Sequence, residues 1–266
     1  MNRIGLYLTG LFVSVLFLTS CLKGSNVQEG YACGVIGVGK DYFTPVLKTN
    51  SGDFYSSNLS SFNLYDGDCC FFYFRLDSDI PENSPNYIES SGYYTISLLQ
   101  LEKINKYYLS SHLMNSISTA LPDEVSVSNG YSSGDYVENH LFITQIVNQP
   151  SDMELSWRLE YDEQTMMPTT DENNKRYYDL YIRATVKKEG EKTAESEKGY
   201  LNAYYMYNYF ATAASKEKEL LGSNYSASSS KFTVRFNYAS SINKETNAVT
   251  WQSYQVEDNI AWFVSN

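Results

Sequence analysis

Short runs of aromatic and β-branched residues, separated by turn signals, are the feature that most limits what this chain can fold into. In Phe232–Tyr238, large apolar side chains alternate with polar ones, the pattern of a half-buried strand. Cys69–Leu76 is the most β-prone run, and it follows an Asp66-Gly67 turn signal. The chain has 25 Tyr against 3 Trp, and tyrosine suits half-buried strands. The sequence therefore predicts an all-β protein.

Further strands are expected on both sides of a boundary near Asn115–Pro122. The runs typical of strands are Tyr31–Val38, Phe43–Lys48, Phe54–Tyr55, Tyr93–Leu101, Val125–Val127, Asn139–Val147, Met153–Tyr161, Tyr177–Val186, Thr250–Val256 and Ile260–Val264. Asp77–Ser91, with two prolines, is predicted to be a loop. Tyr200–Phe210 fits a strand or a helix, and Ala211–Leu221 favours a helical turn. The spacing suggests an antiparallel sandwich in the second half.

The N-terminus carries the clearest targeting signal. Arg3 precedes an apolar stretch, Ile4–Leu18, which ends in Leu18-Thr19-Ser20-Cys21 and resembles a bacterial lipobox. The alternatives are a transmembrane helix, for which the stretch falls short of the about 20 residues needed, and an ordinary cleaved signal. We expect residues 1–20 to be a signal peptide, Cys21 to be acylated, and residues 21–30 to form a lipid-anchored tether.

The net charge and the expected location restrict the kinds of partner that this chain can bind. Cleavage would remove Arg3 and leave 246 residues, with a formal charge of −12 in place of −11. A chain this acidic is a poor candidate for nucleic acid, and its membrane attachment would depend on the acyl chains of Cys21. Lys23 and the lack of an acidic residue before Glu29 favour a periplasm-facing position, with the outer membrane as the expected location. No cofactor is indicated.

The strand pair after the tether, the Asp66-Gly67 turn before Cys69–Phe74, and Tyr93–Leu101 running into Ile104 resemble the NigD-like lipoproteins. Asp123–Gly130 and Gly134-Asp135-Tyr136 resemble the start of that family's second domain. The resemblance implies an OB-like barrel at residues 31–118 and a β-sandwich at residues 119–266. It also implies an uncharacterised role with a link to bacteriocins, and it transfers no catalytic residues. Cys69-Cys70 stand where the family often has a basic-apolar pair.

Besides Cys21, the cysteines are Cys33, Cys69 and Cys70. Export permits a disulfide, and Cys33 could pair with one of the other two. Adjacent strand residues face opposite ways, so both cannot meet Cys33. Three buried thiols are the alternative, and no histidine nearby supports a metal site.

Three patterns resemble catalytic or ligand-binding motifs but lack residues that those motifs need. Gly34–Lys40 fits the phosphate-loop spacing, but Asp41 stands where Ser or Thr is needed and the segment enters a strand. His112 and His140 lack a nucleophile elbow and are expected at the surface or at a strand edge. The paired carboxylates, such as Asp77 with Asp79, are best explained as solvated turns, and Asp77–Glu82 lacks the Gly of a calcium loop.

Aromatic residues supply the remaining functional hint. Tyr200, Tyr204, Tyr205, Tyr207 and Tyr209 could form a binding surface, because tyrosine offers contact area with a polar tip. The alternative is a tyrosine-rich sandwich core. The leading hypothesis is a non-catalytic, lipid-anchored envelope protein that binds a protein or a glycan. The alternative is a carboxylate-dependent glycan hydrolase.

Overall fold

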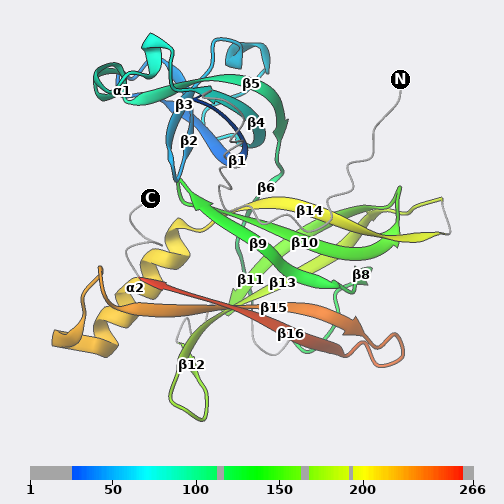
Figure 1. Cartoon of the computed structure of the whole chain (residues 1–266). Coiled ribbons are helices and arrows are strands. Elements are labelled where there is room, and N and C mark those ends of the chain that lie inside the picture. Colours follow the sequence, from blue (N-terminus) through cyan, green and yellow to red (C-terminus); the bar gives the residue numbers. More distant parts are fainter. Residues whose placement is uncertain (1–25, 113–116, 163–167, 192–193, 260–266) are drawn as a thin grey trace. The chain divides into compact units, whose positions relative to one another are not determined.

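The computed structural model describes residues 26–112, 117–162, 168–191 and 194–259 (Figure 1). The predicted signal peptide, Cys21 and the expected strand at Ile260–Val264 lie outside these residues. Within them the chain forms two compact units. The barrel unit comprises residues 26–106 and 135–142, and the sandwich unit comprises residues 107–134 and 143–259.

The barrel unit is a closed five-stranded barrel with the strand order β1-β2-β3-β5-β4. Neighbouring strands are antiparallel except β3 and β5, which are parallel, and β4 pairs with β1 to close the barrel. This order is that of an OB fold, so the expected OB-like barrel is confirmed. The elements are β1 (Val27–Val38), β2 (Pro45–Thr49), β3 (Gly52–Tyr55), a 3-10 turn (Leu59–Ser61), β4 (Cys69–Asp77), a second 3-10 turn (Pro81–Asn83), α1 (Pro85–Ser91) and β5 (Tyr93–Lys103).

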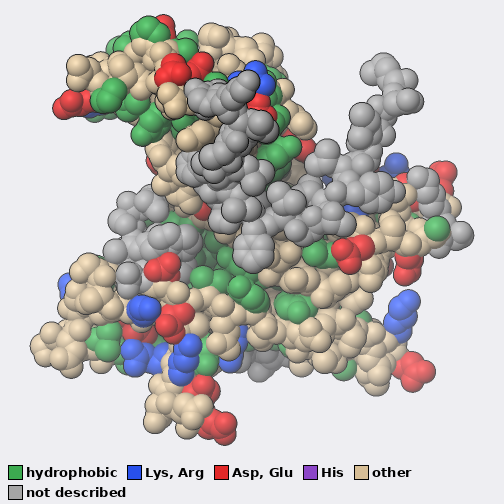
Figure 2. Space-filling model, in the orientation of Figure 1, with side chains coloured by type: hydrophobic (Ala, Val, Ile, Leu, Met, Phe, Trp, Pro, Cys, Tyr) green, Lys and Arg blue, Asp and Glu red, His purple; other side chains and the backbone are tan. Residues whose placement is uncertain are grey.

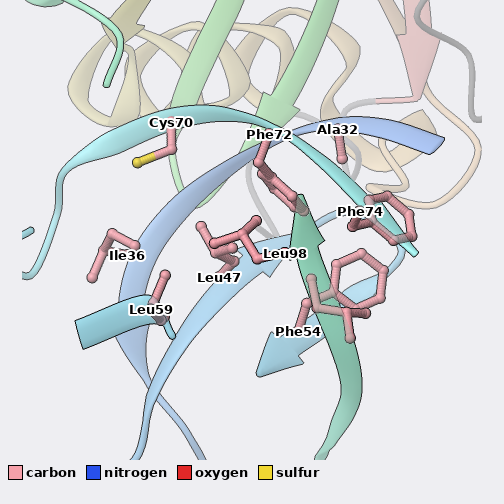
Figure 3. Packing of buried hydrophobic residues seen from close by; sticks show 10 residues of the cluster. Ala32, Ile36, Leu47, Phe54, Leu59, Cys70, Phe72, Phe74 and Leu98 are labelled. Carbon is pink, nitrogen blue, oxygen red and sulfur yellow. The ribbon is translucent and has the colours of Figure 1, made fainter. Parts of the chain in front are cut away.

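The barrel core follows from the alternation in β4. Cys70, Phe72 and Phe74 point inward and are buried (Figure 3). Phe54 of β3 packs against both aromatic rings, with centroids 6.2 Å from Phe72 and 5.0 Å from Phe74. Full burial of a large apolar side chain contributes about 1.5–3 kcal/mol, so this cluster is the main stabilising element of the barrel.

The sandwich unit contains two sheets, with the orders β6-β14-β10-β9 and β16-β15-β13-β11-β7. Its strands are β6 (Lys106–Tyr108), β7 (Ser110–His112), β8 (Glu124–Val125), β9 (Asn129–Val137), β10 (His140–Pro150), β11 (Glu154–Asp162), β12 (Thr169–Thr170), β13 (Arg176–Lys188), β14 (Glu195–Tyr205), β15 (Lys231–Ile242) and β16 (Val249–Asn259). β13 runs parallel to β15, and β7 runs parallel to β11. The second sheet is therefore mixed, which corrects the expectation of a purely antiparallel sandwich.

Aromatic side chains join the two sheets. The ring of Trp157 on β11 lies 5.5 Å from that of Tyr200 on β14, and Tyr131 on β9 lies 4.7 Å from Phe236 on β15. These contacts bury the inner faces of both sheets, as a sandwich core requires.

Residues 200–221 contain both structures that the sequence allowed. The strand β14 ends at Tyr205, and the helix α2 (Tyr207–Leu221) begins two residues later. α2 is fastened to β13 by its buried Glu217, whose carboxylate accepts hydrogen bonds from Arg176 at 3.0 and 2.6 Å and from the Tyr178 hydroxyl at 3.0 Å. A short 3-10 turn (Gly222–Asn224) follows.

Element boundaries differ from expectation in three places. β1 begins at Val27, inside the predicted tether. The predicted loop Asp77–Ser91 contains α1, which ends at Gly92 in a left-handed conformation. The first segment of the barrel unit ends at Lys106, earlier than the expected boundary at 118, because β7 already pairs with β11, and residues 135–142 return to this unit. Among the described residues, no helix is long and apolar enough to cross a membrane.

Candidate functional site

A cleft of about 610 Å³ opens on the outer face of the barrel unit. Its walls come from the end of β1, from Lys48 of β2 and Asp53 of β3, and from the turn that joins β1 to β2. Gly92 and the turn at residues 138–140 complete it. The volume lies within the range of small-molecule sites, about 300–1,000 Å³, and the outer face of strands 2 and 3 is where OB folds bind oligomeric ligands. Hydrophobic side chains lie beside acidic ones on the face of the barrel unit visible in Figure 2.

Four glycines line this cleft: Gly37, Gly39, Gly67 and Gly92. At Gly37 a Cβ would lie 2.7 Å from Cε of Lys48, so a side chain there would displace the lysine. Gly67 and Gly92 have φ of 79° and 82°, a region that favours glycine. At Gly37 and Gly92 the space beside the backbone is filled by Lys48 and Lys40, so the missing side chains let these two lysines pack along the cleft wall.

The turn between β1 and β2 is held by the carboxylate of Asp41. Oδ1 accepts hydrogen bonds from the backbone N–H groups of Phe43 (3.0 Å) and Thr44 (2.9 Å), and Oδ2 accepts one from the Thr44 hydroxyl (2.6 Å). These bonds, led by that of the hydroxyl, lower the pKa of Asp41. Tyr42 is left-handed (φ 64°), and its N–H donates to Gly39 O at 2.9 Å. The turn thus has a defined shape, although it lies at the surface.

Two aromatic side chains project from this turn. Tyr42 is 80% exposed and lines the cleft, and Phe43 is 87% exposed beside it. Lys40, next in the turn, donates a hydrogen bond to Glu89 O of α1 at 3.3 Å. Aromatic side chains that serve only packing are rarely this exposed. The pair therefore indicates a role beyond packing for this turn.

The charged groups of the cleft centre on Lys48. Its Nζ lies 3.7 Å from Oδ2 of Asp53 and 3.7 Å from Oε1 of Glu138. Burial raises the pKa of Asp53, while Lys48 acts in the opposite direction. Asp66 and Lys40 also line the cleft, which therefore presents both hydrogen-bond donors and acceptors.

Glu138 and Asn139 form the two-residue turn between β9 and β10, and both are left-handed, with φ of 47° and 64°. Asparagine tolerates this conformation, but glutamate rarely adopts it. Next to the turn, the buried His140 contacts Glu138 O through Nδ1 at 2.7 Å, and burial lowers the pKa of His140. The expectation that His140 lies at the surface is therefore wrong, although it does begin a strand. The side chain of His112 lies outside the described residues.

The tyrosines predicted to form a binding surface are split between core and surface. Tyr204 and Tyr209 are buried, Tyr200 and Tyr205 are half-buried, and Tyr207 is half-exposed. The hydroxyl of Tyr204 accepts a hydrogen bond from Gln145 at 2.9 Å, and that of Tyr209 donates to Asp179 O at 3.3 Å. As a continuous exposed surface this prediction is wrong, because α2 and the sandwich core take up these rings. The exposed pair at Tyr42 and Phe43 was missed, although two aromatic residues directly after the Gly39-Lys40-Asp41 turn signal could have indicated it.

Cys33, Cys69 and Cys70 are buried free thiols, so the possible disulfide is not formed. Cys70 faces the barrel core, whereas Cys33 lies on the outer face of β1 beside β4. Burial raises the pKa of Cys69 and of Cys70 to about 12, and it also raises that of Cys33. Within the described residues, no three His, Cys, Asp or Glu side chains come together to hold a metal ion.

Comparison with known proteins agrees with this architecture. Residues 24–102 match the family described as a lipoprotein OB domain. The match covers less than a third of the chain and identifies this domain rather than the family of the whole protein. No curated protein matches the sequence.

Solved structures share the fold across both units. An uncharacterised protein from Parabacteroides merdae has a TM-score of 0.70 at 18% identity, over 86% of this chain and 98% of the other. A proposed lipoprotein from Bacteroides fragilis has a TM-score of 0.54 at 14% identity, over 86% and 98%. The neighbours also include a NigD-like immunity protein from Bacteroides caccae, with a TM-score of 0.43 at 10% identity over 90% and 95%, a likeness too low to carry an argument. The chain is thus a barrel-plus-sandwich protein with a lipoprotein-type OB domain, and these identities speak to the fold alone.

Proposed function

We propose that this chain is a lipid-anchored protein of the bacterial cell envelope that acts without catalysis, by binding a protein or a glycan at the barrel cleft. Acylation of Cys21 would provide the anchor, and the outer membrane with a periplasm-facing orientation is the favoured location. The match of residues 24–102 to a lipoprotein OB domain supports the anchor. Nucleic acid is disfavoured, although OB folds often bind it, because the chain carries a formal charge of −11.

The exposure of Tyr42 at the cleft is the observation that best supports the binding role. Its ring is 80% exposed at the mouth of the cleft, on a turn that Asp41 holds in shape. Because the turn is ordered before any ligand arrives, little conformational entropy is lost on binding. Such an arrangement suits recognition better than catalysis.

The test is a pull-down from detergent-solubilised envelope, with the acylated protein as bait. We expect a partner or a bound glycan that is retained by the wild type and lost by Tyr42→Ala. The matched control is Tyr108→Ala, which removes a tyrosine 66% exposed in the sandwich unit. Capture that is equal for all three proteins would contradict a binding role for the cleft.

The anchor needs its own experiment. Metabolic labelling with palmitate is expected to mark the wild type and to disappear in Cys21→Ala. Protease treatment of whole cells is expected to spare a periplasm-facing protein. Labelling that persists in Cys21→Ala would contradict the anchor, and digestion on intact cells would contradict the orientation.

A glycan hydrolase is the second candidate, and one observation favours it. Asp53 and Glu138 both lie within 3.7 Å of the same ammonium group in the cleft, and glycosidases use two carboxylates separated by about 5–10 Å. However, both carboxylates already form ion pairs with Lys48, and this ammonium group would compete with a sugar for them. Release of reducing ends from a glycan by the wild type, lost in Asp53→Asn, would replace the binding proposal with this one.

A further inference from the structure

We infer that the ligand of the barrel cleft is a neutral oligosaccharide, with one sugar ring stacked on Tyr42 and its hydroxyl groups bonded to the Asp53–Lys48–Glu138 cluster. This inference rests on the proposed binding function and names its ligand class. It follows from the chemistry of the cleft, from its shape, and from its position on a closed barrel.

The aromatic mouth matches one side of a sugar. A pyranose ring has an apolar face of C–H groups, which packs well on an exposed aromatic ring. Tyr42 offers such a ring at the cleft, and Phe43 offers a second one next to it. Two neighbouring rings suit a ligand that extends over more than one sugar unit.

The polar groups match the other side of the ligand. Sugar hydroxyls both donate and accept hydrogen bonds, and the cleft supplies acceptors at Asp53, Asp66 and Glu138 and donors at Lys40 and Lys48. Three carboxylates against two ammonium groups give the cleft a net negative charge, because the low pKa of His140 keeps its imidazole uncharged. An anionic glycan would be repelled, so the ligand is neutral.

The shape of the barrel disfavours a peptide in extended form. Because the five strands close on themselves, the barrel offers no free strand edge to which a peptide could add. The cleft instead offers the exposed ring of Tyr42 beside charged side chains, a combination that suits a sugar. A folded protein partner would have to use the aromatic turn alone, and this is the competing outcome of the test.

The experiment is isothermal titration of the acylated full mature protein in detergent micelles. The probes are hexasaccharides of α-1,4-glucose, β-1,4-glucose and β-1,4-mannose, with hexagalacturonate as the anionic control. We expect saturable binding of at least one neutral probe. Tyr42→Ala should weaken it by about tenfold or more, since a stacked ring contributes on the order of a tenfold factor. Tyr42→Phe should lose less, because the ring remains.

The cluster is tested by Asp53→Asn, which is expected to weaken binding of the same probe by about tenfold, whereas Tyr108→Ala should bind like the wild type. Failure of every neutral probe at millimolar concentration, or tighter binding of hexagalacturonate, overturns the inference. A different outcome is that the pull-down still captures a protein that Tyr42→Ala no longer binds. In that case the proposed binding function is supported and the glycan ligand is contradicted. Sugar binding that survives both Tyr42→Ala and Asp53→Asn overturns the cleft as its site.

Discussion

Glu138 reaches Lys48 from a turn position with a left-handed backbone: φ is 47°, and Oε1 lies 3.7 Å from the lysine Nζ. A non-glycine residue in this region costs about 1–2 kcal/mol. The exposed ion pair returns about 1 kcal/mol at most, so it does not by itself explain why glutamate stands there. The proposed role of its carboxylate in binding a ligand at the cleft offers a reason.

Glu138→Gly and Glu138→Ala separate these two effects. Both remove the carboxylate, but glycine adopts the positive φ freely, so we expect Glu138→Gly to be more stable than Glu138→Ala by about 1 kcal/mol. Urea denaturation followed by circular dichroism measures the difference. Equal stability of the two variants would mean that the turn carries no strain.

The Asp41 carboxylate is expected to control the order of the aromatic turn. In Asp41→Ala the N–H groups of Phe43 and Thr44 lose their acceptor, so their amide hydrogens should exchange faster. Asp41→Asn keeps one acceptor oxygen and should lie between Asp41→Ala and the wild type. Hydrogen exchange followed by NMR measures the difference. Unchanged exchange at both amides would mean that the Asp41 carboxylate does not hold the turn in shape.

His140 should make stability depend on pH. Burial is the main cause of its lowered pKa, with Lys106 adding to it, so the folded state prefers neutral imidazole. The resulting stabilisation is complete above the ordinary value of about 6.5 and is lost as pH falls through the lower folded pKa. We expect the unfolding free energy to decrease from pH 7 to pH 5, and to decrease less in His140→Asn. Parallel pH profiles for the two proteins would contradict this prediction.

Arg183 should be the most sensitive charged residue of the sandwich unit. It is fully buried, donates to Ile117 O at 2.8 Å and pairs with Glu124 at 3.3 Å. Arg183→Leu leaves Glu124 unpaired and should lower the unfolding free energy by about 3–5 kcal/mol. Arg158→Leu, at an exposed position 4.0 Å from Glu160, should lower it by less than about 1 kcal/mol.

The pH dependence of the Arg183→Leu defect gives an independent check. Burial already raises the pKa of Glu124, and loss of the arginine should raise it further. An acid with a raised folded pKa is most stabilising below its unfolded pKa, and this contribution is lost as pH rises. The defect should therefore be smaller at pH 5 than at pH 8. A defect of equal size at both values would mean that Glu124 is not its cause.

The three thiols should be inert in the folded protein. Burial raises their pKa values, to about 12 for Cys69 and Cys70, so almost no thiolate is present at neutral pH. Cys33, Cys69 and Cys70 should react with Ellman's reagent only after denaturation, whereas an added thiol in Ser60→Cys should react at once. A reagent-free mass two units below the reduced value would instead reveal a disulfide.

Local sequence patterns predict only part of the candidate site. The Gly34–Lys40 run is a barrel strand and turn rather than a phosphate loop, and two of its glycines, Gly37 and Gly39, line the cleft. Two further cleft residues, Glu138 and His140, lie far along the chain, and no local pattern links them to Lys48. Tyr204 and Tyr209 show the same limit, since tyrosines that bind and tyrosines that fill a core look alike in sequence.

The sequence by itself determined the all-β class, the alternation that sets Cys70, Phe72 and Phe74 on one face of their strand, and the strong turns, because these depend on side chains within a few residues of one another. Only the tertiary structure decided the parallel pairing of β13 with β15, the burial of the three thiols without a disulfide, and the meeting of Lys48 with Glu138. Such contacts join segments distant along the chain, so they depend on how whole strands pack rather than on local preference.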